Sequence, residues 1–227
     1  MVKKDCLYWS VPRVAYRDAW KLQLEQVRRI GAGESGAALL FLEHFPVITI
    51  GKGGAREHLL VPEAVLRARG VECIPIDRGG DITFHGPGQL VVYPLLSLTE
   101  YGRDVHQYLR RLEEIGIRVL ADYGIDGGRV PHYTGVWVGD QKIMAIGVGV
   151  KKWVTFHGLA FNFAADLEGF QWIVPCGIKD KGVTSLHRLL ERPVSRVEVE
   201  AAFVRHFERE FGLALPPPRN PFPAAER

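Results

Sequence analysis

Cysteine is scarce in this chain of 227 residues, and its scarcity excludes a disulfide-stapled fold. The three cysteines are Cys6, Cys73 and Cys176. An odd and sparse set does not build the disulfide framework of a small secreted domain, so a reducing, cytoplasmic setting fits best. No Cys-x-x-Cys or His-Glu-x-x-His spacing occurs either, and the sequence therefore predicts no metal site.

Long apolar runs and a targeting segment are also missing. No window approaches the ~20 apolar residues that a membrane-spanning helix needs. The chain opens Met-Val-Lys-Lys-Asp, without the apolar segment and small residues of a secretory signal. We therefore expect a cytoplasmic protein that has no membrane partner.

Neither sign of charge dominates. The 29 basic and 26 acidic residues give a formal net charge of +3, and the basic residues are scattered along the chain. This distribution does not predict a nucleic-acid partner, although a mild basic bias suits docking to an acidic protein. Hydrophobic residues make up 47% of the chain, which allows a sizeable core.

Helical and strand-like patterns alternate irregularly. Apolar residues at i, i+3 and i+4 predict helices, and short apolar runs between glycine or proline predict strands. The predicted helices are 16–30, 61–69, 105–123, 186–190 and 196–211, and the predicted strands are 7–11, 38–43, 47–50, 71–76, 90–96, 134–138, 142–150 and 154–163. This mixture favours an α/β or α+β fold, with mixed β-sheets flanked by helices, over a doubly wound Rossmann fold.

The chain shows no internal repeat and no low-complexity linker. We therefore treat residues 1–213 as a single domain. Residues 214–227 contain five prolines and no periodic pattern, so we expect a loosely packed tail. Ser195, with Glu198 three residues later, predicts a capping box at the start of the last helix. Residues 125–133 are expected to form a loop.

Two glycine clusters lie between predicted strands in residues 78–94. Gly79 and Gly80 follow one strand, and Gly86-Pro87-Gly88 precedes the next. Because glycine permits positive φ and close approach to the backbone, the clusters suggest a wall against which a ligand lies. Polar groups on that wall would be Arg78, Asp81, Thr83 and His85. The alternative is a loop followed by an ordinary hairpin turn, since the pattern is neither a Rossmann nor a P-loop fingerprint.

Cys176 differs from the other cysteines because Pro175 precedes it and Gly177 follows it. A bend there could hold the sulfur at the mouth of a cavity, and backbone N–H groups beside a glycine can form an oxyanion hole. A nucleophilic cysteine needs its thiolate, and a nearby cation lowers the thiol pKa from ~8.5. The alternative is a buried free cysteine that behaves as a small hydrophobe.

Lys142, His85 and His157 are the candidate bases for such a cysteine. Lys142 begins an apolar strand, and a lysine at the buried end of a hairpin has a depressed pKa. An exposed lysine that caps the hairpin is the alternative, and spacing alone favours it. Each histidine lies beside glycine in a strand context, where a hydrogen-bonded structural histidine is the commoner outcome.

Four blocks of the sequence resemble the signature of the lipoyl(octanoyl) transferase family. They are Arg-Gly-Gly-Asp-Ile-Thr-Phe-His-Gly-Pro-Gly-Gln at 78–89, Gly-Val-Trp-Val at 135–138 with Lys-Ile-Met-Ala-Ile-Gly at 142–147, His-Gly-Leu-Ala-Phe-Asn at 157–162, and Pro-Cys-Gly-Ile at 175–178. The blocks follow the family's order, and the flanking lengths match over nearly the whole chain. The resemblance implies a fold shared with biotin protein ligases and lipoate-protein ligases.

The resemblance also implies an activity. A family member moves an octanoyl or lipoyl group from acyl carrier protein to a specific lysine of lipoyl domains, which is the first step of endogenous lipoate biosynthesis. The acceptors would be the lipoyl domains of 2-oxoacid dehydrogenase complexes and the glycine cleavage H protein. No cofactor and no ATP are expected, because a thioester becomes an amide.

Site residues carry over by position from the family motifs. Cys176 would be the acyl-thioester nucleophile, and Lys142 would lower its pKa. Asp81 stands at a variable position of the motif, and Phe84 stands where tyrosine is frequent. Glycines 79, 80, 147 and 158 are expected to leave room for the acyl chain. The acyl pocket would be lined by Arg78, Gly79, Gly80, Asp81, Ile82, Thr83, Phe84, His85, Ala145, Ile146, Gly147, Gly158, Leu159 and Ala160.

Two other functions compete with this interpretation. An ATP-dependent lipoate-protein ligase shares the fold but works without an essential cysteine. A non-catalytic module that binds carrier proteins needs neither Cys176 nor Lys142. The presence of both residues argues against either alternative.

Overall fold

The structure is a computed structural model, and it describes residues 3–174 and 181–222. Its elements in chain order are β1 (Lys4–Ser10), α1 (Tyr16–Gly31), β2 (Ala37–Leu42), β3 (Val47–Ile50), η1 (Arg56–His58), α2 (Glu63–Ala68), β4 (Glu72–Pro75), β5 (Ile82–His85), β6 (Gln89–Leu95), η2 (Leu98–Glu100), α3 (Val105–Asp122), β7 (Gly128–Val130), β8 (Tyr133–Val138), β9 (Gln141–Lys151), β10 (Val154–Asn162), η3 (Leu167–Trp172), β11 (Gly182–Val183), α4 (Leu186–Leu190), α5 (Arg196–Phe211) and β12 (Leu213–Ala214).

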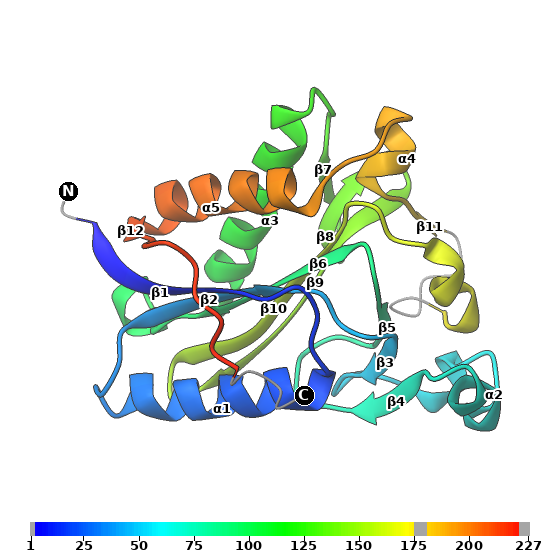
Figure 1. Cartoon of the computed structure of the whole chain (residues 1–227), viewed down its shortest axis with the longest axis horizontal. Coiled ribbons are helices and arrows are strands. Elements are labelled where there is room, and N and C mark those ends of the chain that lie inside the picture. The colour runs from blue at the N-terminus through cyan, green and yellow to red at the C-terminus, as the bar shows by residue number, and fades with distance from the viewer. Residues whose placement is uncertain (1–2, 175–180, 223–227) are drawn as a thin grey trace.

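Two mixed sheets organise the part of the chain that is described. The larger has nine strands in the order β12-β1-β2-β6-β10-β9-β8-β7, with β11 beside β9 (Figure 1). The smaller has the order β4-β3-β5. The long β9–β10 hairpin lies near the middle of the larger sheet, and its partners include both antiparallel β6 and parallel β11. The predicted mixed-sheet α/β architecture is therefore confirmed.

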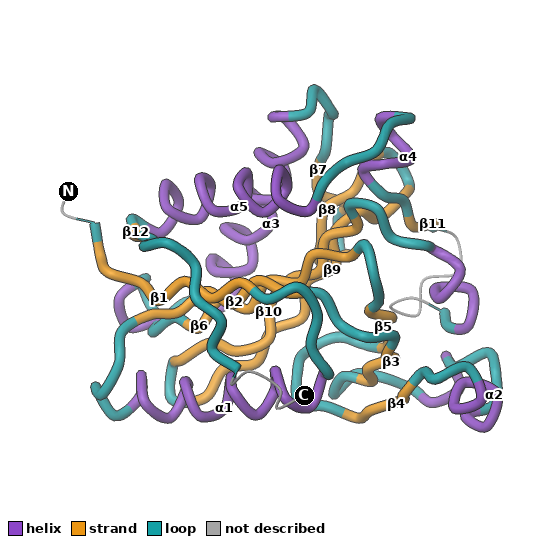
Figure 2. The backbone as a smooth tube through the Cα atoms, in the orientation of Figure 1, coloured by secondary structure: helices purple, strands orange, loops and turns teal. Residues whose placement is uncertain are grey.

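Helices cover both faces of the larger sheet. Figures 1 and 2 show α3 and α5 on one face and α1 on the other. Leu39 and Phe41 of β2 belong to the core under α3 and α5, whereas Leu40 and Leu42 pack on the α1 side. Successive side chains of a strand point to opposite faces, so a strand covered on both faces must be apolar throughout. This explains the unbroken run Ala-Ala-Leu-Leu-Phe-Leu.

The last helix begins as its sequence predicts. The Ser195 hydroxyl accepts a hydrogen bond from the Glu198 N–H, and the Glu198 carboxylate accepts from the Ser195 N–H. Two of the unpaired N–H donors of the first turn are satisfied in this way. Gly212 ends the helix at φ 63°, a conformation that favours glycine.

One expectation from the sequence was wrong. Residues 128–130, expected within a loop, form a short strand that pairs with β8. In the described part of the tail at 214–227, Ala214 pairs with β1 and the Arg219 N–H donates to the Tyr8 carbonyl, while residues 216–220 are exposed. The prolines lack an N–H donor, but Arg219 retains its own and pairs with β1 beside Trp9.

None of the helices within residues 3–174 and 181–222 has the length and apolar character that a membrane crossing needs. The same residues contain no cluster of His, Cys, Asp or Glu suited to a metal ion.

Candidate active site

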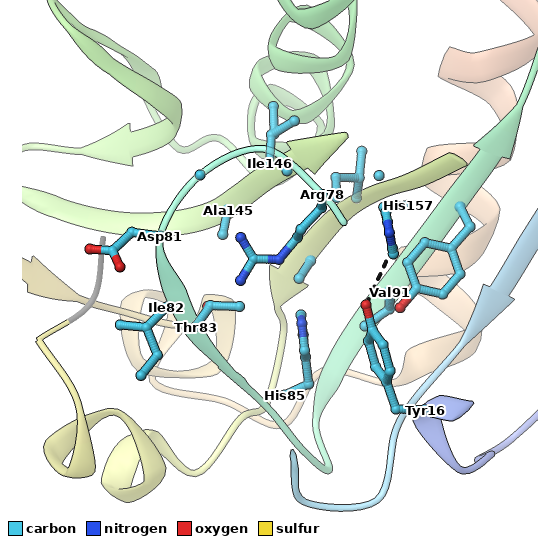
Figure 3. Close-up of a pocket in the computed structure, with 16 residues that line it drawn as sticks. Tyr16, Arg78, Asp81, Ile82, Thr83, His85, Val91, Ala145, Ile146 and His157 are labelled. Atoms are coloured by element: carbon cyan, nitrogen blue, oxygen red, sulfur yellow. Dashed lines mark hydrogen bonds between the residues drawn. The ribbon is translucent and has the colours of Figure 1, made fainter. Parts of the chain in front are cut away.

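A cavity lies on the α1 face of the larger sheet, where residues 78–85 pass over β9 and β10. It leaves about 470 Å³ empty, part of it open to solvent. All of the predicted acyl-pocket residues except Gly79 and Phe84 line it. Figure 3 shows Asp81 at one end of the cavity and Tyr16 with His157 at the other. Four lining residues were not on the predicted list: Tyr16, Val91, Tyr93 and His157.

Phe84 and Gly79 have other contacts. Thr83 and His85 share the cavity face of β5, and Phe84 between them points to the opposite face, as strand alternation requires. There its ring meets the edge of Phe170 and of Trp172, with ring centroids 5.8 Å apart in each case. The Gly79 N–H donates to the Val148 carbonyl at 2.8 Å, which fastens the segment to β9.

That the four glycines leave room for an acyl chain stays a prediction, but protein atoms also lie close to each of them. A Cβ on Gly147 would lie 2.9 Å from the Arg78 side chain, and one on Gly158 would lie 2.2 Å from the Val92 carbonyl oxygen. Cβ positions on Gly79 and Gly80 also meet protein atoms within 3.4 Å. Glycine is required at 147 and 158 because backbone and side chains of the protein approach closely, and this approach brings the cavity walls together.

Arg78 is held inside the cavity wall. One guanidinium nitrogen donates to the carbonyl and the hydroxyl oxygen of Thr49 at 2.9 and 3.0 Å, and the other donates to the Gly79 carbonyl at 3.0 Å. The residue is 8% exposed. A fixed buried cation beside the cavity disfavours protonation of nearby imidazoles.

Lys142 is buried, so the alternative of an exposed hairpin cap is excluded. It is 7% exposed, and its Nζ lies 4.7 Å from the centroid of the Trp137 ring. The lysine lines a smaller cavity that shares Thr83, Ala145 and Ala160 with the main one. The lysine therefore lies beside the main cavity, near the start of β9, and the indole face attracts its charged form.

His85 and His157 are neutral, hydrogen-bonded histidines. Burial lowers the pKa of His85 to about 3 and that of His157 to about 4. His85 Nδ1 is 2.6 Å from the Gln89 Oε1, and His157 Nε2 is 2.9 Å from the Asp77 Oδ1. Imidazoles with such low pKa values are weak bases at neutral pH, which supports the structural interpretation of both.

An amide network that the sequence did not predict leads from His85 toward Lys142. The Gln89 Nε2 donates to the Asn162 Oδ1 at 2.9 Å, and the Asn162 Nδ2 donates to the Thr184 carbonyl at 3.1 Å. The Thr184 N–H donates to the Lys142 carbonyl at 3.0 Å. Gln89 and Asn162 end two of the family-like blocks, and this position was the available signal.

Cys176 and the rest of the block at 175–178 lie outside the described residues, so the pairing of Cys176 with Lys142 stays a prediction. The residues on either side of 175–180 are paired. The Val174 N–H donates to the His58 carbonyl at 2.8 Å, and Val183 pairs with Lys142 in parallel register.

Solved structures share this fold over nearly the whole chain. A lipoate-protein ligase A bound with ATP matches with a TM-score of 0.73 at 19% identity, covering 98% of this chain and 90% of that one. Ta0514, a putative lipoate protein ligase from T. acidophilum with bound lipoic acid, matches with a TM-score of 0.71 at 18% identity and the same coverage. The biotin protein ligase from Aquifex aeolicus in complex with biotin and ATP gives 0.55 at 14% identity, covering 92% and 71%.

The sequence itself defines the class. Residues 15–208 match the family model of the lipoyl protein ligase A/B catalytic domain. Within that class, octanoyltransferases are similar along most of the chain. The one from Solibacter usitatus is 46% identical over 94% of this chain and 96% of its own, and the one from Rubrobacter xylanophilus is 50% identical over 87% and 89%. The chain belongs to the octanoyltransferase family.

Proposed function

We propose that the chain moves an octanoyl or lipoyl group from acyl carrier protein to a lysine of a lipoyl domain, through a thioester on Cys176. The observation that carries the proposal is the buried Lys142, which lies beside the main cavity near the start of β9. An ammonium beside a thiol favours the thiolate, which is the nucleophile. Family membership supplies the type of transfer.

The connectivity of the chain is compatible with a Cys176–Lys142 pair. Val183, which pairs with Lys142, follows Cys176 by seven residues. A segment of that length spans at most ~25 Å when extended. The cysteine therefore has enough chain to reach the amine. Lys142 is buried and lines a smaller cavity that shares Thr83, Ala145 and Ala160 with the main one.

The proposed reaction has two balanced steps. Cys176 loses its proton with the help of Lys142, the thiolate attacks the carrier thioester, and the carrier leaves as a thiol that takes up the proton. The amine of the acceptor lysine then attacks the acyl-Cys176 carbonyl. Its free pKa is ~10.4, so it must lose a proton, and Lys142 accepts it while the Cys176 thiolate leaves. Thioester plus amine becomes amide plus thiol, so ATP is not consumed.

The partners follow from the same proposal. The donor is octanoyl-acyl carrier protein, and the acceptors are the lipoyl domains of 2-oxoacid dehydrogenase complexes and the glycine cleavage H protein. A lipoate protein ligase from Thermoplasma acidophilum was solved as part of a system with its E2 lipoyl domain, and it shares this fold. That precedent supports a lipoyl domain as the acceptor.

Intact mass after incubation with octanoyl-acyl carrier protein, without ATP, tests the proposal. We expect one octanoyl adduct on the parent protein, removable by hydroxylamine and absent from Cys176→Ser. Lys142→Ala should acylate more slowly by roughly 10²–10⁴-fold, the usual contribution of a positioned acid–base group. Modification of a lipoyl domain only when ATP and free octanoate are supplied would instead establish an ATP-dependent ligase.

A further inference from the structure

Three polar side chains from distant parts of the sequence close the inner end of the acyl cavity. Tyr16 comes from α1, Tyr93 from β6 and His157 from β10, and all three line the cavity. They are 4%, 3% and 1% exposed. Figure 3 shows the Tyr16 and His157 side chains meeting at the end of the cavity that lies away from Asp81.

Hydrogen bonds hold the His157 and Tyr16 side chains in place. His157 Nε2 is 2.9 Å from the Asp77 Oδ1, and because a carboxylate only accepts, Nε2 carries the proton. The Tyr16 hydroxyl, 3.2 Å from His157 Nδ1, is then the donor to that nitrogen. The His157 N–H donates to the Gln23 Oε1 at 2.7 Å. Moving the imidazole would leave buried polar atoms without partners, so it is held in place.

Tyr93 is fixed in a similar way. His44 Nδ1 is 2.9 Å from the Val14 carbonyl oxygen, which can only accept, so that nitrogen is the donor. His44 Nε2 therefore accepts from the Tyr93 hydroxyl at 2.7 Å. The two tyrosines thus have satisfied hydroxyls on a rigid scaffold.

The register of β9 and β10 gives the distance along the cavity from Ala145 to His157. Ala145 pairs with Ala160 at the end shared with the Lys142 cavity, and Val148 pairs with His157 at the closed end. These two pairs are three residues apart on each strand, which is about 10 Å at ~3.3 Å per residue. An extended octanoyl chain spans about 9 Å from C1 to C8, taking bonds of ~1.5 Å at tetrahedral angles.

We propose that Tyr16, supported by His157 and Tyr93, is the stop that limits the acyl chain to about eight carbons. This inference rests on the proposed acyl transfer and identifies which residues select its substrate. The pocket residues implied by the family resemblance would lie alongside the acyl chain, whereas Tyr16 would lie across its end. A chain two carbons longer would have to displace a hydrogen-bonded tyrosine, which a close-packed interior resists.

The test is a chain-length profile of Cys176 acylation with hexanoyl, octanoyl, decanoyl and dodecanoyl thioesters of acyl carrier protein. The parent should lose rate by roughly tenfold or more between octanoyl and decanoyl, within the range by which one methylene is discriminated in a pocket. Tyr16→Leu shortens the stop, so its decanoyl-to-octanoyl ratio should rise by about tenfold. Tyr16→Phe keeps the ring across the cavity and should stay within about threefold of the parent ratio.

Val27→Ala is the matched control, because Val27 is a buried residue of α1 that does not line the cavity. It should weaken packing under the same helix and leave the ratio unchanged. The stop is overturned if the parent takes decanoyl as fast as octanoyl, or if a folded Tyr16→Leu keeps the parent profile. If Tyr16→Leu does not fold, equal parent rates with octanoyl and decanoyl thioesters still overturn the stop.

Calorimetric binding of the free C6 to C12 acids separates this inference from the proposed function. A parent that is not acylated by any thioester, but whose affinity for free acids still falls beyond eight carbons, would remove the transferase proposal and keep the stop. Efficient acylation with no dependence on acyl-chain length would keep the transferase proposal and remove the stop.

Discussion

The buried carboxylate of Glu113 accepts a hydrogen bond from the Gly135 N–H at 3.1 Å, and it also binds the guanidinium groups of Arg110 and Arg129 at 2.7 and 2.9 Å. Gly135 has φ 131°, and a Cβ there would lie 3.4 Å from the Lys142 side chain. Glu113 on α3 therefore fixes the strand that supports the lysine.

Replacing Glu113 by alanine should lower the free energy of unfolding by about 2–3 kcal/mol. The substitution leaves a buried N–H without an acceptor, although both arginines can turn toward water. Urea unfolding measures the loss. Glu25→Ala is the control, since Glu25 is an exposed carboxylate that pairs with Arg28, and the variant should unfold at nearly the same urea concentration as the parent.

Replacing Trp137 should lower the rate of Cys176 acylation. Its ring lies 4.7 Å from the Lys142 Nζ and 6.0 Å from the Lys181 Nζ. Trp137→Leu removes the face that attracts the ammonium, and we expect about tenfold slower acylation of Cys176, equivalent to ~1.4 kcal/mol. Trp137→Phe retains a weaker aromatic face and should restore part of the rate. Equal rates in the parent and Trp137→Leu would refute a role for the indole in holding Lys142.

Gly158 should not tolerate a side chain. A Cβ there would lie 2.2 Å from the Val92 carbonyl oxygen and 2.7 Å from Pro94. Because backbone cannot yield as a flexible side chain can, Gly158→Ala should separate β10 from β6 and lower the melting temperature by more than ~5 °C. Gly128→Ala is the matched control: a Cβ there meets nothing within 4 Å, and its melting temperature should stay near that of the parent.

The cavity walls could be predicted from sequence because contiguous blocks carry them, but its closed end could not. Tyr16, Tyr93 and His157 are far apart in the chain. Pairing of β6 with β10 brings the last two near each other, and the packing of α1 on the sheet adds Tyr16. Nothing local to Tyr16 distinguishes it from any aromatic residue on a helix stripe.

Strand alternation in the sequence could have corrected one assignment, whereas the burial of Glu113 could not have been predicted. Phe84 was placed in the pocket by a contiguous motif, although strand alternation assigns it to the face opposite Thr83. Glu113 lies on α3 next to its apolar stripe, and only the tertiary structure shows that its carboxylate is buried. The helices and the central strands were predictable because the spacing of their apolar residues in the sequence matches the face that is buried.

Acid should destabilise the protein well above the range in which carboxylates titrate. Burial is the largest cause that lowers the pKa of His44 to about 4, of His85 to about 3 and of His157 to about 4. In the unfolded chain these histidines titrate near 6.5, so the unfolded state binds more protons between pH 6.5 and about 4. Their contribution to stability is therefore complete above pH 6.5 and declines as the pH falls through that window.

Each histidine contributes a slope of at most ~1.4 kcal/mol per pH unit in that window, and three together should lower the free energy of unfolding by several kcal/mol. Urea unfolding between pH 7.5 and 5 measures the slope. His85→Gln should make it shallower by about one proton, because it removes one buried imidazole that the unfolded chain can protonate. His106→Gln, which changes an exposed histidine of α3, should leave the slope unchanged. A parent protein equally stable at pH 7.5 and pH 5 would show that these imidazoles do not stay neutral in the folded state.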